Sequence, residues 1–417
     1  MKEILNFLDV FAGAGGLSEG FIQAGFKPIA HIEHDRAACF TLKTRMAYHW
    51  LKKNNKIDLY NSYLNQEITR QKLYSSVPLK IIESVIPLSI GEKNEEIFYQ
   101  IDQILDDQRI DVLIGGPPCQ AYSLVGRSRD KNRMLGDSRN YLYKYYAEFL
   151  DKYSPRYFLF ENVIGLLSAN DKDGSKYFDN MRNLFAEYGY KISYEVLNSR
   201  HYGIPQNRKR VILFGSRNIN NNTFPKPEEQ KINYTIFDLF DDLPKINAGQ
   251  GSISPCKYRK QINKNVEILN LRNTSDILTW HISRPNIKRD LKIYKIAVDI
   301  WNRKQKRLKY IDLPANLKTH NNLKSFHDRF KVVVGENNFS HTVVAHISKD
   351  GHYYIHPDIQ QNRSITPREA ARLQTFPDNY YFEGVTEKPS RTQCFKQIGN
   401  AVPVLLSRKI GEKLREY

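Results

Sequence analysis

Cysteine is scarce in this chain, and long apolar runs are missing. The four cysteines, Cys39, Cys119, Cys256 and Cys394, lie far apart without the CxxC or Cys/His spacing of a zinc site. We therefore expect no disulfide framework and no metal, which suits a reducing cytoplasm. No apolar stretch approaches the length of a membrane span, and the start, Met1-Lys2-Glu3, does not resemble a signal peptide.

Acidic residues are also in short supply. The chain has 45 Asp and Glu against 63 Lys and Arg, a net charge of +18. Most of the excess falls between residues 256 and 331, where 19 Lys and Arg face 6 Asp and Glu, an excess of 13. A lysine-rich stretch is often only a solvated surface, but an excess this concentrated favours a surface that faces nucleic-acid phosphates.

The length and the order of the apolar segments indicate two domains. A chain of 417 residues suits two domains better than one. Up to Ser216, short apolar strands alternate with helical patterns, which predicts an α/β fold with a doubly wound, mostly parallel sheet. The stretch 218–227 is rich in Asn and Pro and resembles a linker to a second, smaller and more basic domain.

The most informative stretch is GGPPCQ at 115–120, directly after the apolar run 111–114. Two glycines and two prolines end the predicted strand in a stiff turn. Cys119 would project from this turn into the crevice at the carboxyl edge of the sheet. Taken alone, the stretch is equally compatible with a turn that holds a buried structural cysteine.

A second signal lies near the amino terminus. A predicted strand at 4–10 leads through FAGAGG (11–16) into a helix at 17–25, an order typical of a loop that cradles a nucleotide-like cofactor. The next strand, 27–32, ends in Glu33, where a carboxylate can accept both hydroxyls of a ribose. The alternative for Glu33 is an exposed acid at a strand end.

Later segments supply further polar groups. A strand at 157–160 ends in Glu161, which would face the same crevice as Cys119. Arg208 and Arg210 precede a strand at 211–214, and 124–137 has the composition of a loop that closes over a substrate. We interpret 45–100 as an insertion at the sheet edge, and we expect a helix from Thr366 to Leu373 with Pro367 as its first residue.

Six of these stretches, taken together and in this order, resemble the DNA (cytosine-5)-methyltransferases, which use S-adenosylmethionine. They are DVFAGAGGLSEGF (9–21), GGPPCQAYS (115–123), ENV (161–163), QNRKRV (206–211), RSITPREAARLQ (363–374) and QIGNAVP (397–403). The resemblance implies a Rossmann-like S-adenosylmethionine methyltransferase domain at 1–215 plus 395–417. It also implies a basic target-recognition domain at 216–394, with its variable part at about 224–362.

The resemblance implies four catalytic residues. Cys119 would add to C6 of cytosine, and Glu161, protonated or sharing a proton, would hydrogen-bond N3. Arg210 would bind O2, and Arg208 would support Glu161 or the thiolate. The residues implied to bind the cofactor are Phe11, Ala12, Gly13, Gly15, Gly16, Leu17, Glu33, His34, Ile90, Pro117, Leu142, Asn400 and Ala401. His34 stands where the family often has an aromatic residue, and Ile90 is a guess because the insertion obscures that position.

The expected partner is double-stranded DNA, read by a monomer in a prokaryotic cytoplasm at the nucleoid. Modification within a restriction–modification system, with or without a partner endonuclease, is the leading interpretation. There are two alternatives. The protein either carries out the same chemistry on tRNA or is a non-catalytic, DNA-binding relative. The Pro-Pro-Tyr or Pro-Pro-Trp turn of amino-methylating enzymes is absent, which argues against transfer to adenine N6.

Overall fold

A seven-stranded sheet forms the centre of the molecule. The computed structural model describes residues 3–91, 94–118, 138–217, 223–321, 326–334 and 339–417. The strand order is β3-β2-β1-β4-β5-β8-β6, and within this sheet only β8 runs antiparallel to its neighbours. The strands are β1 Asn6–Val10, β2 Lys27–Ile32, β3 Val85–Ile86, β4 Val112–Gly115, β5 Tyr157–Asn162, β6 Lys191–Asn198 and β8 Lys209–Ser216. The predicted α/β class is confirmed.

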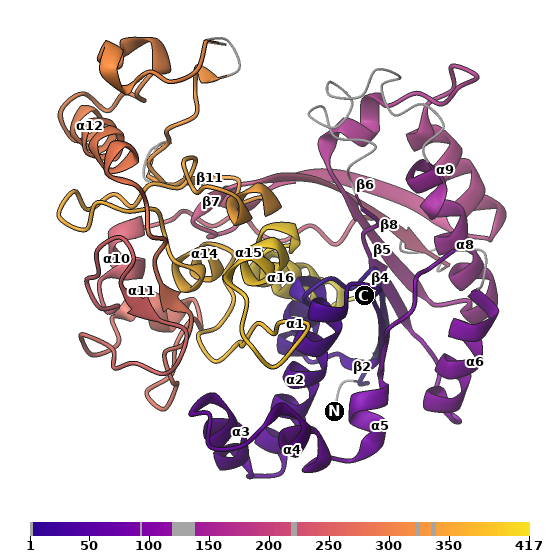
Figure 1. The fold of residues 1–417 in the computed structure, drawn as a ribbon. Helices are drawn as coiled ribbons and strands as arrows, with labels where there is room; N and C mark the ends of the chain where they lie inside the picture. Colours follow the sequence, from indigo (N-terminus) through magenta and orange to yellow (C-terminus); the bar gives the residue numbers. More distant parts are fainter. Residues whose placement is uncertain (1–2, 92–93, 119–137, 218–222, 322–325, 335–338) are drawn as a thin grey trace.

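Helices cover both faces of the sheet (Figure 1). On one face lie α1 Gly16–Gln23, α2 Arg36–Lys53 and α16 Val404–Leu414, and on the other lie α6 Asn94–Leu105, α8 Leu142–Tyr153 and α9 Tyr177–Glu187. Burial on both faces explains why β1, β4 and β5 read as continuous apolar runs. The carboxyl ends of β1, β4 and β5 therefore meet at one edge of a rigid support.

The segment interpreted as an insertion divides into two parts. Helices α3 Ile57–Leu64, α4 Arg70–Ser75 and α5 Leu79–Glu83 pack on the end of α2 around Tyr48, Tyr60 and Leu73. By contrast, β3 pairs with β2 as an edge strand, and α6 covers the sheet. Strand β3 and helix α6 are therefore part of the regular alternation, and only α3, α4 and α5 before them are additional.

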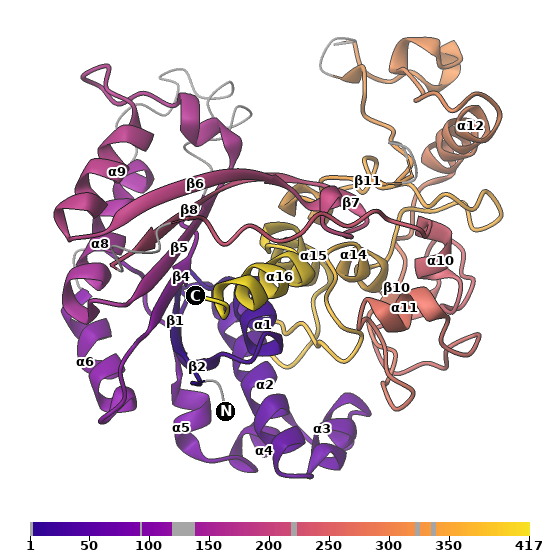
Figure 2. The same cartoon turned by 180° about the vertical axis from the view of Figure 1, so that it is seen from behind.

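The second region contains short elements and one long helix (Figure 2). They are α10 Ile236–Phe240, α11 Lys264–Ile268, α12 Lys288–Lys304, the pair β9 Gly251–Ser252 and β10 His281–Ile282, and the pair β7 Gln206–Asn207 and β11 Ser340–His341. Short 3₁₀ turns lie at Ser138–Tyr141, Ile164–Ser168, Ser199–His201, Tyr310–Asp312, Ala315–Leu317 and Ala345–Ser348. One cluster of buried apolar side chains runs from β1 to α12, so this region packs against the sheet domain without a break.

Helices α14 Pro367–Leu373 and α15 Arg391–Asn400 connect the second region to α16. Thr366 accepts the backbone N–H of Glu369, and the Glu369 carboxylate accepts the backbone N–H of Thr366. This capping box and Pro367 at the first position fix the start of α14, and the predicted helix with Pro367 as its first residue is confirmed.

Candidate active site

The glycine-rich loop lies between the end of β1 and the start of α1. Gly13 and Gly15 have positive φ, at 57° and 79°, a conformation that glycine adopts without a steric penalty. Phe11 also has positive φ, at 59°. At Gly16 an added Cβ would lie 2.3 Å from the backbone oxygen of Val402. The loop therefore packs directly on the segment after α15, and a side chain at residue 16 would separate the two.

Glu33 holds the glycine-rich loop. One oxygen of its carboxylate accepts the backbone N–H of Gly13 at 2.8 Å. The other accepts the backbone N–H groups of His34 and Asp35 at 2.8 and 2.7 Å. Glu33 is only 8% exposed, whereas the side chain of His34 is 65% exposed. The structure thus brings Glu33 and the loop together, with His34 beside them. The contact of His34 Nδ1 with Glu33 Oε1, at 3.2 Å, raises the pKa of the imidazole.

A second carboxylate, Asp9, is buried in β1 near Glu33. Asp9 is 0% exposed, and burial, followed by the negative charge of Glu33, raises the pKa of its carboxyl well above the usual range. The two acids therefore lie close together at the carboxyl ends of neighbouring strands, and the raised pKa favours the protonated form of Asp9. The sequence analysis gave Asp9 no role, although it is the first residue of a stretch that carries the resemblance.

Segments near the carboxyl terminus fix the loop from the other side. The hydroxyl of Tyr380 donates to Ala14 O at 2.6 Å, and Gln374 Nε2 donates to Ala401 O at 3.0 Å. Asn400 ends α15, and Ala401 follows it as a buried residue. Tyr380 and Gln374 were not predicted as part of the site, because nothing local in the sequence indicates a contact across so many residues.

The other predicted cofactor residues lie at strand or helix ends. Ile90 is buried after β3 in the same apolar cluster as Val10, with Phe11 packed at its margin. Pro117 follows β4, and its carbonyl accepts Asn162 Nδ2 at 3.5 Å. Leu142 is the first residue of α8. Ala12 is buried in a smaller cluster, and Leu17 in the first turn of α1 packs against the large one.

Glu161 lies one residue beyond the strand position opposite Gly115. In the register of β4 and β5, Gly115 pairs with Phe160. An added Cβ at Gly116 would lie 2.8 Å from Glu161 Oε2. The carboxylate therefore rests against the backbone where the Gly-Gly-Pro-Pro turn begins. Cys119 itself lies outside the described residues.

Of the two predicted arginines, Arg210 lies on β8, the strand next to β5, and Arg208 immediately precedes that strand. Arg210 Nε lies 2.7 Å from Glu161 Oε1, and both side chains are mostly buried. Arg208 is 2% exposed, and its Nη1 donates to Val343 O at 2.8 Å. The contact to Glu161 comes from Arg210, and Arg208 ties this strand to the second region.

The arrangement combines three features at one edge of the sheet. A glycine-rich loop with two acids lies at the end of β1, a Gly-Gly-Pro-Pro turn follows β4, and a carboxylate–guanidinium pair lies on β5 and β8. Among the helices of the described ranges, none combines the length and the apolar character that a membrane span needs. Within the described ranges, no group of His, Cys, Asp and Glu has the geometry of a metal site.

Comparison with known proteins places this site in a family. The family model for C-5 cytosine-specific DNA methylases matches residues 5–73 and 89–416. A type II methyltransferase of Bacillus paralicheniformis, M.Bpa9945I, is 41% identical, and the alignment covers 98% of each chain. Another, M.DdeI of Desulfomicrobium norvegicum, is 29% identical over 99% of this chain and 89% of the relative.

A solved E. coli structure, described as a prophage-encoded DNA modification methyltransferase, has the same fold. It superposes with a TM-score of 0.62 at 23% identity, over 99% of each chain. The family match extends over nearly the whole chain and includes every stretch that forms the site. The protein is therefore a member of the C-5 cytosine-specific DNA methylase family and has DNA cytosine-5 methyltransferase activity.

Proposed function

We propose that the enzyme methylates a cytosine flipped out of a specific double-stranded DNA sequence, through a covalent bond between Cys119 and C6. The observation that carries this proposal is the Glu161–Arg210 pair against Gly116, at the start of the turn that leads to Cys119. An acid and a guanidinium at that place suit the polar edge of a cytosine.

The chemistry explains the residue types. C5 of cytosine is a poor nucleophile, but addition of the Cys119 thiolate to C6 makes C5 enamine-like. Glu161 would hydrogen-bond N3 as electron density builds there, and Arg210 would both hold Glu161 and bind O2. After C5 gains the methyl group, a base removes the C5 proton, the C6–sulfur bond breaks, and Cys119 leaves as thiolate.

The target base must leave the duplex first. Stacking covers C6 on both sides, so no side chain can reach it within the helix. Flipping costs a few kcal/mol, which contacts in the pocket must offset. Arg208, whose guanidinium ties its strand to Val343 of the second region, would keep the catalytic strand and the DNA-reading region in fixed relation.

As a member of this family, the enzyme uses S-adenosylmethionine, which supplies the methyl group when bound. The Glu33 carboxylate fits this ligand, because a sulfonium and an ammonium are cationic and Glu33 follows β2 beside the glycine-rich loop. Glu33 would accept the ribose hydroxyls. The glycine-rich loop and the Asn400–Ala401 segment would enclose the remainder, and no metal is required.

The biological setting is part of the same proposal. The type II methyltransferases named above support a role in restriction–modification, with a possible cognate endonuclease that need not touch this chain. We propose a monomer acting in a prokaryotic cytoplasm, with residues 216–394 as target-recognition domain. The basic excess between residues 256 and 331 supports DNA as the partner of that domain.

Bisulfite sequencing of DNA from cells that express the protein tests this function. Wild type should protect one cytosine within one recurring sequence, and Cys119→Ser should protect none. Sequencing bisulfite-treated tRNA from the same cells tests the alternative substrate. Protection of tRNA without protection of DNA, or equal protection of DNA by Cys119→Ser, would contradict the proposal.

A further inference from the structure

An open pocket of about 580 Å³ lies on the second region, lined by residues of the segment 256–278. None of its lining residues belongs to the active site described above. Four of them are cationic, Lys257, Arg259, Lys260 and Arg272, and one, Asp276, is acidic. The pocket is therefore a candidate for an anionic ligand.

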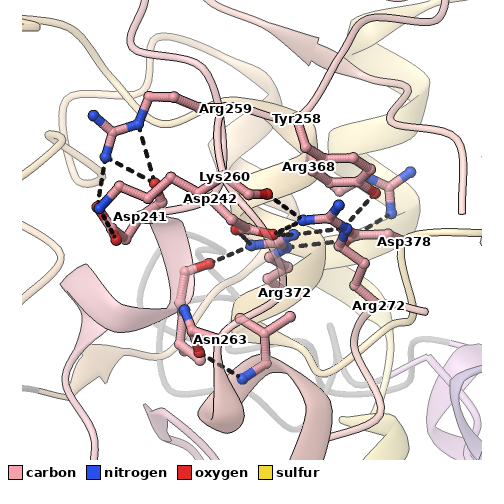
Figure 3. Close-up of polar contacts among 12 residues, drawn as sticks. Asp241, Asp242, Tyr258, Arg259, Lys260, Asn263, Arg272, Arg368, Arg372 and Asp378 are labelled. Atoms are coloured by element: carbon pink, nitrogen blue, oxygen red, sulfur yellow. Dashed lines mark hydrogen bonds and ion pairs between the residues drawn. The ribbon is translucent and has the colours of Figure 1, made fainter. Parts of the chain in front are cut away.

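Arg272 is fixed in this pocket with part of its guanidinium unused (Figure 3). Nη1 donates to Asp242 Oδ2 at 2.8 Å and to Lys260 O at 3.1 Å, and the guanidinium lies 3.4 Å from the centre of the Tyr258 ring. The residue is 8% exposed and its Nε is buried without a hydrogen-bond partner, and the hydrogen bonds that the guanidinium makes within the described ranges all come from Nη1. Stacking and two bonds thus hold a planar cation whose Nη2 is left as the donor for a ligand.

The ion pairs beneath Arg272 leave positive charge in excess. Arg372 contacts Asp242 at 2.5 Å and Asp378 at 2.5 Å, and Arg368 lies 3.8 Å from Asp378. The guanidiniums of Arg272, Arg368 and Arg372 therefore share the two carboxylates of Asp242 and Asp378 (Figure 3). All five side chains are buried. A buried charge without a counter-charge is costly, so an anion bound next to Arg272 would be stabilised.

The remaining charges at the pocket do not cancel this excess. Lys257 is exposed at the rim, while Arg259 and Lys260 lie 2.6 and 2.7 Å from the exposed carboxylate of Asp241. Asp276 accepts hydrogen bonds from Asn379 Nδ2 and the Asn273 backbone N–H. Burial raises the pKa of the Asp276 carboxyl, which weakens its opposition to an anion.

We propose that this pocket binds an oxyanion of the phosphate type, held by Nη2 of Arg272 and by Lys257. A guanidinium edge matches the geometry of phosphate oxygens, and a mobile ammonium at the rim can close on them. The phosphate is either one of the DNA backbone outside the catalytic crevice or a free anion. The site makes no use of the methyl-transfer chemistry. Its DNA source rests on the proposed function, in which residues 216–394 face DNA, whereas a free anion as the source does not.

The test compares full-length wild type with Lys257→Gln, which leaves the buried ion pairs intact, and with Arg272→Lys. Inorganic phosphate is the probe, titrated at constant ionic strength against chloride while thermal unfolding is followed. Phosphate should raise the Tm of wild type more than chloride does, and its apparent Kd should weaken about tenfold in Lys257→Gln. Lys264→Gln, an exposed lysine of α11 outside the pocket, is the matched control and should behave as wild type.

Two duplexes then distinguish the sources of the phosphate. If it belongs to DNA, Lys257→Gln should weaken binding of a duplex of about four helical turns more than binding of a duplex of about one turn. If Lys257→Gln binds both duplexes as wild type does but binds inorganic phosphate more weakly, the ligand is a free anion. A wild type that responds equally to phosphate and chloride, or a Lys257→Gln variant that responds as wild type does, would overturn the proposal.

Discussion

Substitution of Glu33 by glutamine separates two functions of one carboxylate. In the structure, Glu33 accepts three backbone N–H groups at 2.7 to 2.8 Å while 8% exposed. Glutamine has one carbonyl oxygen, which accepts, and one NH2 group, which only donates. Its NH2 group would therefore face either the backbone N–H of Gly13 or those of His34 and Asp35, and donor would meet donor. A hydrogen bond to a charged group contributes about 1.5–3 kcal/mol. We therefore expect Glu33→Gln to lower the free energy of unfolding by about 2 kcal/mol.

The same change should weaken cofactor binding. Loss of one charge-assisted contact to the ribose corresponds to a factor of about 10 to 100 in the Kd for S-adenosylmethionine. At saturating cofactor, kcat should change little, because the ribose contact is the same in the ground and transition states. DNA affinity should stay within about threefold of wild type, since no step of DNA binding uses Glu33.

Three assays measure these quantities separately. Urea unfolding gives the stability, isothermal titration calorimetry gives the cofactor Kd, and fluorescence anisotropy gives DNA affinity. Glu187→Gln, an exposed acid at the end of α9, is the matched control. If stability falls while the cofactor Kd is unchanged, Glu33 only holds the loop. If DNA affinity falls as much as cofactor affinity does, Glu33 lies on a different functional surface from the one proposed.

Three further predictions follow from other parts of the chain. Lys306 is exposed after α12, and we expect it to contact a DNA phosphate. Lys306→Gln should therefore reduce the slope of log affinity against log salt concentration by about 1 without changing the methylated sequence. An altered methylated sequence with an intact salt slope would show that Lys306 reads bases. Gly116→Ala would place a Cβ 2.8 Å from Glu161 Oε2 and displace that carboxylate, so kcat should fall at least about tenfold while the cofactor Kd is unchanged. A wild-type rate of methyl transfer in single-turnover assays would refute this. His31 and His356 are fully buried, and burial lowers the pKa of each to about 3. Their neutral form therefore stabilises the fold above about pH 6.5, and as pH falls toward 3 each group should cost about 1.4 kcal/mol per pH unit. Urea unfolding of His356→Asn should show a pH slope smaller by about that amount, and an unchanged slope would contradict the assignment.

Local signals predicted the sheet and its immediate connections well. The strand at Lys27–Ile32 and the helix that begins at Pro367 have the bounds expected, because apolar runs and a capping box are encoded by adjacent residues. The segment 45–100 was less tractable, because its position depends on distant partners. Arg45, for example, pairs with buried Glu19 at 2.7 Å and donates to Asn379.

The site was predicted in its composition more than in its contacts. The proximity of Glu33 to the glycine-rich loop follows from the strand–loop–helix pattern, and the structure has it. Which of the two arginines contacts Glu161 depends on the pairing of β5 with β8, and no pattern along the chain gives that register. Tyr380 and Gln374 were missed for the same reason, since they meet the loop only through the fold.

The most direct test of the account is covalent trapping. DNA fragments made with 5-fluorocytosine in place of every cytosine contain the target whatever its sequence. Fluorine cannot leave C5 as a proton does, so elimination should stall after methyl transfer and leave Cys119 bonded to C6. With S-adenosylmethionine, wild type should form a denaturant-resistant adduct whose mass includes the DNA strand and one methyl group, and Cys119→Ser should form none. An adduct that persists in Cys119→Ser, or the absence of any adduct with wild type that methylates ordinary DNA, would contradict the central claim.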